Sequence, residues 1–264
     1  MDPMPFIDAH SHLQDPRLAA DLDGVLARAE RAGVEAVVVC GTAEGDWDRV
    51  VDLCQTRPRL VPMLGLHPWH VAEAQPGWEV RLEERLRVSG AGLGECGLDF
   101  AREGGDRTVQ EAALRHQLRL ARALEVPLAL HCRKAWESLG RLVREEGLPA
   151  SGALLHAFSG SAETALEMQR LGFSLSFGCP IADPENRRAA KVLPEVWPDR
   201  LLFESDAPDL PPRHLESWPP EAPNEPAQLA GVATAAARLR GEPLAHAAGL
   251  AHANARRIFA RWLP

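Results

Sequence analysis

Apolar, β-rich runs recur along the chain at a regular interval. Counted at positions 10, 40, 67, 95, 131, 156, 177 and 206, near the end of each run, the steps between them are 21 to 36 residues long. A strand, a helix and their connections together occupy about 30 residues. Several runs are continuously apolar, which is typical of parallel strands covered on both faces. The runs span residues 5–10, 34–40, 60–67, 91–97, 126–132, 152–158, 172–177 and 200–206.

The segments between these runs have the spacing of amphipathic helices. Residues 18–33 and 107–125 carry apolar side chains at helical intervals, and Gly33 suits the end of the first helix. Eight strand–helix units predict an α/β fold of the (β/α)8 TIM barrel type. The competing architecture is an open, doubly wound sheet. Against it, the chain has no Gly-rich dinucleotide-binding motif after its first run.

We expect one domain over residues 1–264, because a barrel of this type needs roughly 250 residues and the sequence shows no break in composition. The Pro-rich stretch at 207–226 predicts a long loop after the eighth strand. Two C-terminal helices, at 226–240 and 243–262, are expected to complete the chain.

Composition narrows the class of protein. No apolar run reaches the ~18–20 residues of a membrane helix, and the first residues lack the basic flank and apolar core of a signal peptide. Five cysteines without a CxxC motif predict reduced thiols and a cytoplasmic location. The net charge of −8 argues against a broad basic face for nucleic acid, but permits an enzyme that meets a phosphate through metal ions in a pocket.

Histidines and carboxylates stand at the ends of the predicted strands. In a barrel these ends share one rim, where active sites form. His10 and His12 lie two residues apart, so in extended chain their side chains point to the same side. Alone, such a pair is more typical of a polar turn; the four further residues favour a metal site. The candidate ligands are His10, His12, Glu95, His131, His156 and Asp206.

Imidazole and carboxylate ligands suit Zn²⁺, Mn²⁺, Ni²⁺ or Fe²⁺, whereas Mg²⁺ prefers more oxygen ligands. Six ligands exceed what one catalytic ion with an open position needs. We therefore expect two divalent ions bridged by Glu95. The alternative is a single ion, with Glu95 or Asp206 as general base.

Seven ordered motifs resemble those of the TatD-type metal-dependent deoxyribonucleases: FIDAHSHL, GLHPWH, GECGLDF, LHCRKAWE, LLHAFSGS, ESDAPDLPP and NEPAQL. The resemblance covers residues 6–226, with a further match at 253–259. It implies a (β/α)8 barrel, divalent metal ions and hydrolysis of DNA phosphodiester bonds. By position, the six residues above match the metal ligands of the family, and His67 matches a site residue after the third strand.

Roles follow for the residues at this rim. Asp206 is the candidate to accept the proton of the attacking water, and Glu95 and His67 complete the catalytic candidates, with His67 binding a phosphate oxygen or protonating the leaving group. Arg133 and Arg102 are candidates to bind the substrate phosphate.

For three further residues near the rim, the sequence is compatible with two roles each. Glu204 either supports the site or pairs with an arginine. Trp69 and Trp218 either stack on a base or pack within the fold.

Two departures from the family weaken the inference about substrate. Asp209 stands where the family often has an aromatic residue, and PPEAP at 219–223 replaces a common Arg-Gly. We expect single-stranded or damaged DNA ends as substrate, no membrane partner, and a monomer. The alternative function is an amidohydrolase-type barrel that cleaves C–N or lactone bonds. Such barrels commonly bridge two ions with a carboxylated lysine after the fourth strand, where this chain has Glu95. A barrel that only binds a ligand is the third possibility.

Overall fold

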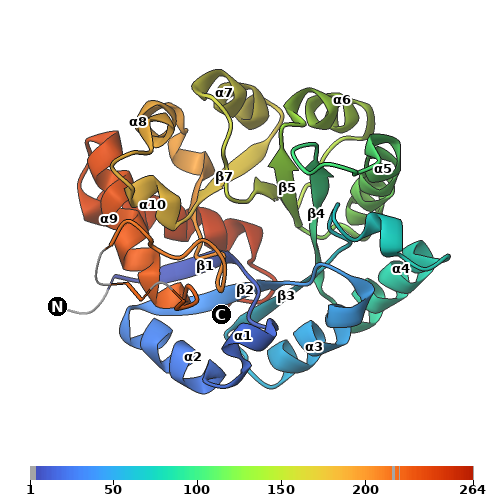
Figure 1. The fold of residues 1–264 in the computed structure, drawn as a ribbon, viewed down its shortest axis with the longest axis horizontal. Coiled ribbons are helices and arrows are strands. Elements are labelled where there is room, and N and C mark those ends of the chain that lie inside the picture. The colour runs from blue at the N-terminus through green and yellow to red at the C-terminus, as the bar shows by residue number, and fades with distance from the viewer. Residues whose placement is uncertain (1–3, 216–217, 220, 264) are drawn as a thin grey trace.

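The computed structural model describes residues 4–215, 218–219 and 221–263. Eight parallel strands follow one another in chain order around a ring, and the helices lie outside it (Figure 1). The consecutive order confirms the TIM-barrel prediction over the doubly wound sheet, whose strand order reverses. The strands are β1 (Phe6–Ser11), β2 (Val34–Cys40), β3 (Leu60–Leu64), β4 (Gly92–Asp99), β5 (Leu128–Arg133), β6 (Ala153–Leu155), β7 (Phe173–Phe177) and β8 (Leu201–Phe203).

The ring closes just beyond β8 through the backbone of β1. The amide of Asp206 donates to the His10 carbonyl at 3.0 Å, and the amide of His12 donates to the Ala207 carbonyl at 2.6 Å. The buried carboxyl of Asp8 accepts hydrogen bonds from the amide (2.8 Å) and hydroxyl (2.5 Å) of Ser205. Burial raises the pKa of Asp8 to about 8. The closure therefore brings the two ends of the sheet together directly below the predicted metal site.

The helices agree with the predicted periodicity, with one exception. The helices are α1 (Pro16–Ala19), α2 (Leu22–Arg31), α3 (Glu44–Gln55), α4 (Trp78–Ser89), α5 (Arg107–Leu124), α6 (Trp136–Glu146), α7 (Ala162–Arg170), α8 (Arg187–Val192), α9 (Leu229–Arg240) and α10 (Leu244–Ile258). The prediction of one helix over 18–33 was wrong. Asp15 caps the short α1, and Asp21 then leaves the helical region (φ −137°, ψ 29°), so that a second helix starts at Leu22.

The C-terminal helices are shorter than predicted. A 3₁₀ turn over Pro226–Gln228 precedes α9, and α10 ends at Ile258. Ile258 and Phe259 pack with residues of β1, β2 and β8, so the end of the chain contributes to the core. In the part of the chain that the structure describes, no helix has the length and apolar character needed to cross a bilayer.

Candidate metal centre

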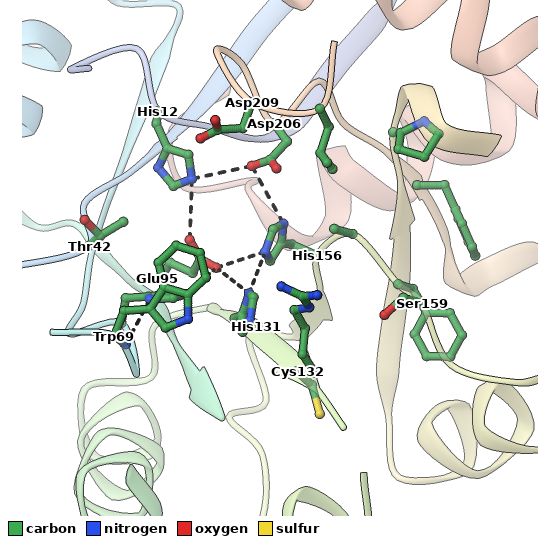
Figure 2. Close-up of a pocket in the computed structure, with 18 of the residues that line it drawn as sticks. His12, Thr42, Trp69, Glu95, His131, Cys132, His156, Ser159, Asp206 and Asp209 are labelled. Atoms are coloured by element: carbon green, nitrogen blue, oxygen red, sulfur yellow. Dashed lines mark hydrogen bonds and ion pairs between the residues drawn. The ribbon is translucent and has the colours of Figure 1, made fainter. Parts of the chain in front are cut away.

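Six predicted ligands from five strands meet at the carboxyl end of the barrel, and Figure 2 labels all of them except His10. Three of them lie within strands and three lie just after one. All are largely buried. On the strands are His10 (β1), Glu95 (β4) and His131 (β5); after strands are His12 (β1), His156 (β6) and Asp206 (β8). The structure therefore brings together residues that are up to 196 positions apart in the chain.

The carboxylate of Glu95 stands between two groups of imidazoles. Its Oε2 lies 3.4 Å from Nε2 of both His10 and His12. Its Oε1 faces the other way, 3.3 Å from His131 Nδ1 and 2.9 Å from His156 Nε2. Each oxygen of the Glu95 carboxylate thus lies close to a separate pair of imidazole nitrogens.

Asp206 completes the first of these groups. Its Oδ1 lies 3.4 Å from His12 Nε2 and 3.8 Å from His10 Nε2. This oxygen and Nδ1 of His156 are buried, and neither has a hydrogen-bond partner among the residues that the structure describes. Buried polar atoms without partners are costly, and a cation satisfies oxygen and imidazole lone pairs together. The donor set therefore fits two divalent cations that share Glu95.

His67 joins the second group. Its Nε2 lies 3.4 Å from Glu95 Oε1, and donor atoms of His67, Glu95 and His131 lie within 4.8 Å of one another. The amide of Trp69 donates to His67 Nδ1 at 3.2 Å, which places the ring proton on Nε2.

Close packing of the strands gives Glu95 its position. A Cβ on Gly65 would stand 2.7 Å from the Glu95 carbonyl oxygen, and a Cβ on Gly97, whose φ is 141°, would stand 2.0 Å from that of His131. Only glycine lets the neighbouring strands approach this closely. These two positions therefore set the distance of Glu95 from β3 and β5.

Burial keeps two of the imidazoles neutral. It lowers the pKa of His10 to about 4, with the charge of His156 adding to the effect, and lowers that of His67 to about 3. Neutral imidazole is the form that binds metal. Burial also lowers the pKa of His12, but the neighbouring carboxylates of Asp206 and Glu95 outweigh it and raise this pKa to about 9. A cation that binds His12 therefore replaces a proton.

Hydrogen bonds from a second layer of residues orient the ligands. His12 Nδ1 lies 2.8 Å from the Cys40 carbonyl, which leaves Nε2 facing Glu95. His131 Nε2 lies 3.0 Å from Asp99 Oδ2, which leaves Nδ1 facing Glu95. A carbonyl or carboxylate partner of this kind fixes the orientation of a metal-binding imidazole and raises its basicity.

Comparison with known proteins places this geometry in a family. A model of TatD related DNases matches residues 7–260. The chain belongs to the TatD-related DNase family. It is 33% identical to the 3'-5' ssDNA/RNA exonuclease TatD of Enterobacter lignolyticus, covering 96% of this chain and 98% of the relative. It is 31% identical to the metal-dependent hydrolase YabD of Bacillus subtilis, over the same shares. The crystal structure of the TatD homologue YjjV from Escherichia coli superposes with a TM-score of 0.90, at 31% identity and with 97% and 98% of the two chains covered.

The chain is thus a metal-dependent hydrolase of the TatD-related family.

Two buried carboxyls, Asp8 and Asp99, were missed by the sequence reasoning. Each was detectable in principle: Asp8 precedes His10 by two residues on the same strand, and Asp99 stands between Leu98 and Phe100, two residues after the run that contains Glu95. A charged residue inside an apolar run is the signal, since unpaired carboxylates are rarely buried.

A cavity of about 1260 Å³ opens above the cluster. Arg133 lines it, with its Nη1 4.0 Å from Asp99 Oδ2, whereas Arg102 is not among the described lining residues. The guanidinium of Arg102 instead lies 5.3 Å from the centre of the Trp69 ring. Three arginines that the sequence reasoning missed also line the cavity: Arg49, Arg187 and Arg188. They lie on helices α3 and α8, and nothing in the sequence singled them out, because they are far from every motif in the chain.

The three other residues predicted near the rim, Trp69, Trp218 and Glu204, lie in different surroundings. Trp69 lines the cavity, and its side chain is 42% exposed. Trp218 does not line it and donates to the Ala222 carbonyl within its own loop. Glu204 is buried; its Oε1 accepts a hydrogen bond from the Ala157 amide and lies 3.6 Å from Nδ1 of the ligand His156.

Asp209, which departs from the family pattern, forms part of an ion-pair bridge across the cavity mouth. Arg17 donates two hydrogen bonds to Asp209, at 2.8 and 3.1 Å, and also pairs with Asp15 at 2.9 Å. An ion pair therefore joins the loop after β8 to the loop after β1.

Proposed function

We propose that the chain is a divalent-metal-dependent nuclease that hydrolyses phosphodiester bonds of DNA, with single-stranded or damaged ends as its substrate. The observation that supports this most strongly is the division of Glu95 between two groups of imidazoles, Oε2 toward His10 and His12 and Oε1 toward His131 and His156. A pair of divalent ions held by these residues would supply an activated water and would neutralise charge that develops on a phosphoryl group. Zn, Mn, Ni, Fe and Mg are all candidates.

The residues of the chain would hold these ions in two sets. His10, His12 and Asp206 surround one oxygen of Glu95, and His131 and His156 surround the other. A site with open coordination positions is typical of catalytic metal centres, since the substrate and water must also bind.

Asp206 is the proposed proton acceptor. Its Oδ1 is buried and has no hydrogen-bond partner within the described part of the chain, and the residue also lines the cavity. It accepts the proton of the water that attacks phosphorus as the P–O bond to the leaving oxygen breaks. General-base catalysis of this kind typically contributes 10²- to 10⁴-fold to the rate.

His67 acts as a hydrogen-bond donor in this proposal. A pKa of about 3 leaves its imidazole neutral near pH 7, with the proton on Nε2. A neutral imidazole is a poor proton donor to a leaving alkoxide. Of the two roles expected from the sequence, donation of a hydrogen bond to a phosphate oxygen is therefore favoured.

Arg133 is the proposed binding residue for the next phosphate. Its side chain is 56% exposed on the cavity wall, and Arg133 follows the ligand His131 by two residues in the chain. The planar guanidinium binds two phosphate oxygens at once. Arg102 stays a candidate only for a phosphate outside the cavity.

The proposal is tested by stripping the protein with EDTA and adding Mn²⁺, Mg²⁺ or Zn²⁺ back. Single-stranded DNA, duplex DNA, RNA and a panel of lactones and amides are then offered to each form. Phosphodiester cleavage that EDTA abolishes and metal restores supports the proposal. Activity that ignores EDTA contradicts the metal mechanism. Cleavage of lactones or amides alone favours the amidohydrolase alternative.

A further inference from the structure

We propose that Trp69 forms a stacking subsite for one unpaired nucleobase, which Asp99 fixes relative to the metal ligand His131. The inference rests on the proposed function for the identity of the substrate, and deepens it. It assigns the preference for a single strand to one side chain, because a paired base cannot leave its helix to stack on protein without an energetic cost.

Trp69 is exposed on the wall of the cavity and yet fixed in place. Its backbone amide donates to His67 Nδ1 at 3.2 Å, and its Nε1 donates to Asp99 Oδ2 at 2.9 Å. Its ring meets the His67 ring edge-on, with the centroids 4.9 Å apart. With 42% of its surface still exposed, it offers an aromatic surface that loses little freedom when a ligand packs against it.

One carboxylate positions three functional groups on this wall. Asp99 Oδ2 accepts from Trp69 Nε1, lies 3.0 Å from His131 Nε2, and lies 4.0 Å from Arg133 Nη1. An aromatic ring, a cation and a metal ligand are therefore held together at one point. A nucleotide offers a base, a phosphate and a scissile P–O bond, which are the three chemical groups that this wall would recognise.

The charges around Trp69 also favour a nucleotide. The guanidinium of Arg102 lies 5.3 Å from the ring centre, and Arg133 is 56% exposed. The acidic residues Asp15 and Asp209 line the cavity with the loops after β1 and β8. Figure 2 shows Trp69 on the other side of Glu95 from Asp209. A polyanion therefore meets two guanidinium groups on the Trp69 side, whereas the loops after β1 and β8 carry an arginine already paired with two carboxylates.

The test measures binding of a fluorescein-labelled hexadeoxynucleotide by anisotropy in EDTA, where no turnover occurs. A matched oligonucleotide lacks only its 3'-terminal base. We expect wild-type protein to bind the intact strand more tightly than the abasic one. Trp69→Leu should weaken binding of the intact strand roughly fivefold to 100-fold, the contribution of one stacked base, and leave the abasic strand unaffected. Trp69→Phe should retain most of the difference, because the ring remains.

Trp218→Leu is the matched control, because Trp218 bonds within its own loop away from the cavity. It should bind both strands as the wild type does. Wild-type protein that binds the two strands equally, or binds neither, overturns the proposal; so does Trp69→Leu if it weakens both strands to the same extent.

Hydrolysis of bis(p-nitrophenyl) phosphate, a diester without a base, separates this proposal from the proposed function. With Mn²⁺, hydrolysis of this diester by wild-type protein measures the metal centre without a base to bind, and Trp218→Leu, the control variant, should hydrolyse it at the wild-type rate. If wild-type protein hydrolyses no phosphodiester, the proposed function is wrong, while the base-dependent binding is still judged by anisotropy.

Discussion

Replacing Glu95 with glutamine should remove one of the two metal ions and not the other. Glutamine keeps the shape of the side chain but replaces one oxygen by an amide nitrogen and removes the charge. In the described part of the chain, no carboxylate other than that of Glu95 lies within 4.0 Å of His131 Nδ1 or His156 Nε2. The group around His12 keeps Asp206, 3.4 Å away. The ion held by His131 and His156 therefore loses its only charged ligand.

The size of this effect follows from Coulomb's law. A carboxylate about 2 Å from a cation contributes roughly 8 kcal/mol per unit of cation charge at an effective dielectric constant of ~20. Losing even half of this weakens binding about 1000-fold, because ~1.4 kcal/mol is a factor of ten. Glu95→Gln should therefore bind one ion tightly where the wild type binds two, and should lose at least 1000-fold in phosphodiesterase activity.

The assay is metal content after dialysis, together with titration of Zn²⁺ or Mn²⁺ into EDTA-stripped protein. Glu185→Gln is the control, because Glu185 is an exposed carboxylate on the wall of the same cavity, outside the cluster. It should bind two ions with wild-type affinity. Two tightly bound ions in Glu95→Gln would refute the assignment of Glu95 as the bridging ligand. One ion in the wild type would support the single-ion alternative.

Four other outcomes are expected. Asp206→Asn should keep the fold and lower kcat at least 100-fold; wild-type cleavage of DNA with Mn²⁺ would remove Asp206 from the role of proton acceptor. Asp99→Asn should weaken metal binding 10- to 100-fold in a competition with a chromogenic chelator, because His131 loses its anionic partner, and unchanged affinity would contradict this. Hydrogen bonds from Arg119, with Arg115 adding to them, lower the pKa of Glu146 to about 2 from its ordinary value of 4.5. The stability that this pairing contributes is therefore present above about pH 4.5 and is lost as the pH falls toward 2. Glu146→Gln should lower the melting temperature at pH 7 but not at pH 2; an equal loss at both would contradict the pairing. Binding of DNA should weaken only modestly with salt, and a slope that corresponds to six or more phosphate contacts would contradict recognition confined to the cavity.

The barrel itself was predictable because its signals are local. Apolar runs at a regular interval define parallel strands, and the spacing of apolar residues defined α5 to within one residue. The split between α1 and α2 was not predictable from periodicity. There, the cap at Asp15 and the non-helical backbone of Asp21 determine where the chain turns, while the apolar spacing continues across the break.

The sequence by itself determined which residues stand at the strand ends, since a position near the end of a parallel strand lies at the same rim in any closed barrel. The sequence did not determine which of these residues form each of the two groups around Glu95. Only the tertiary structure decided that Glu95 faces two sets of imidazoles, that Asp99 orients His131 and Trp69 together, and that Arg102 lies against Trp69. The physical reason is distance. Strand alternation gives the side on which a residue lies, whereas contacts of 3 Å between residues on different strands depend on strand register and on close approach at Gly65 and Gly97.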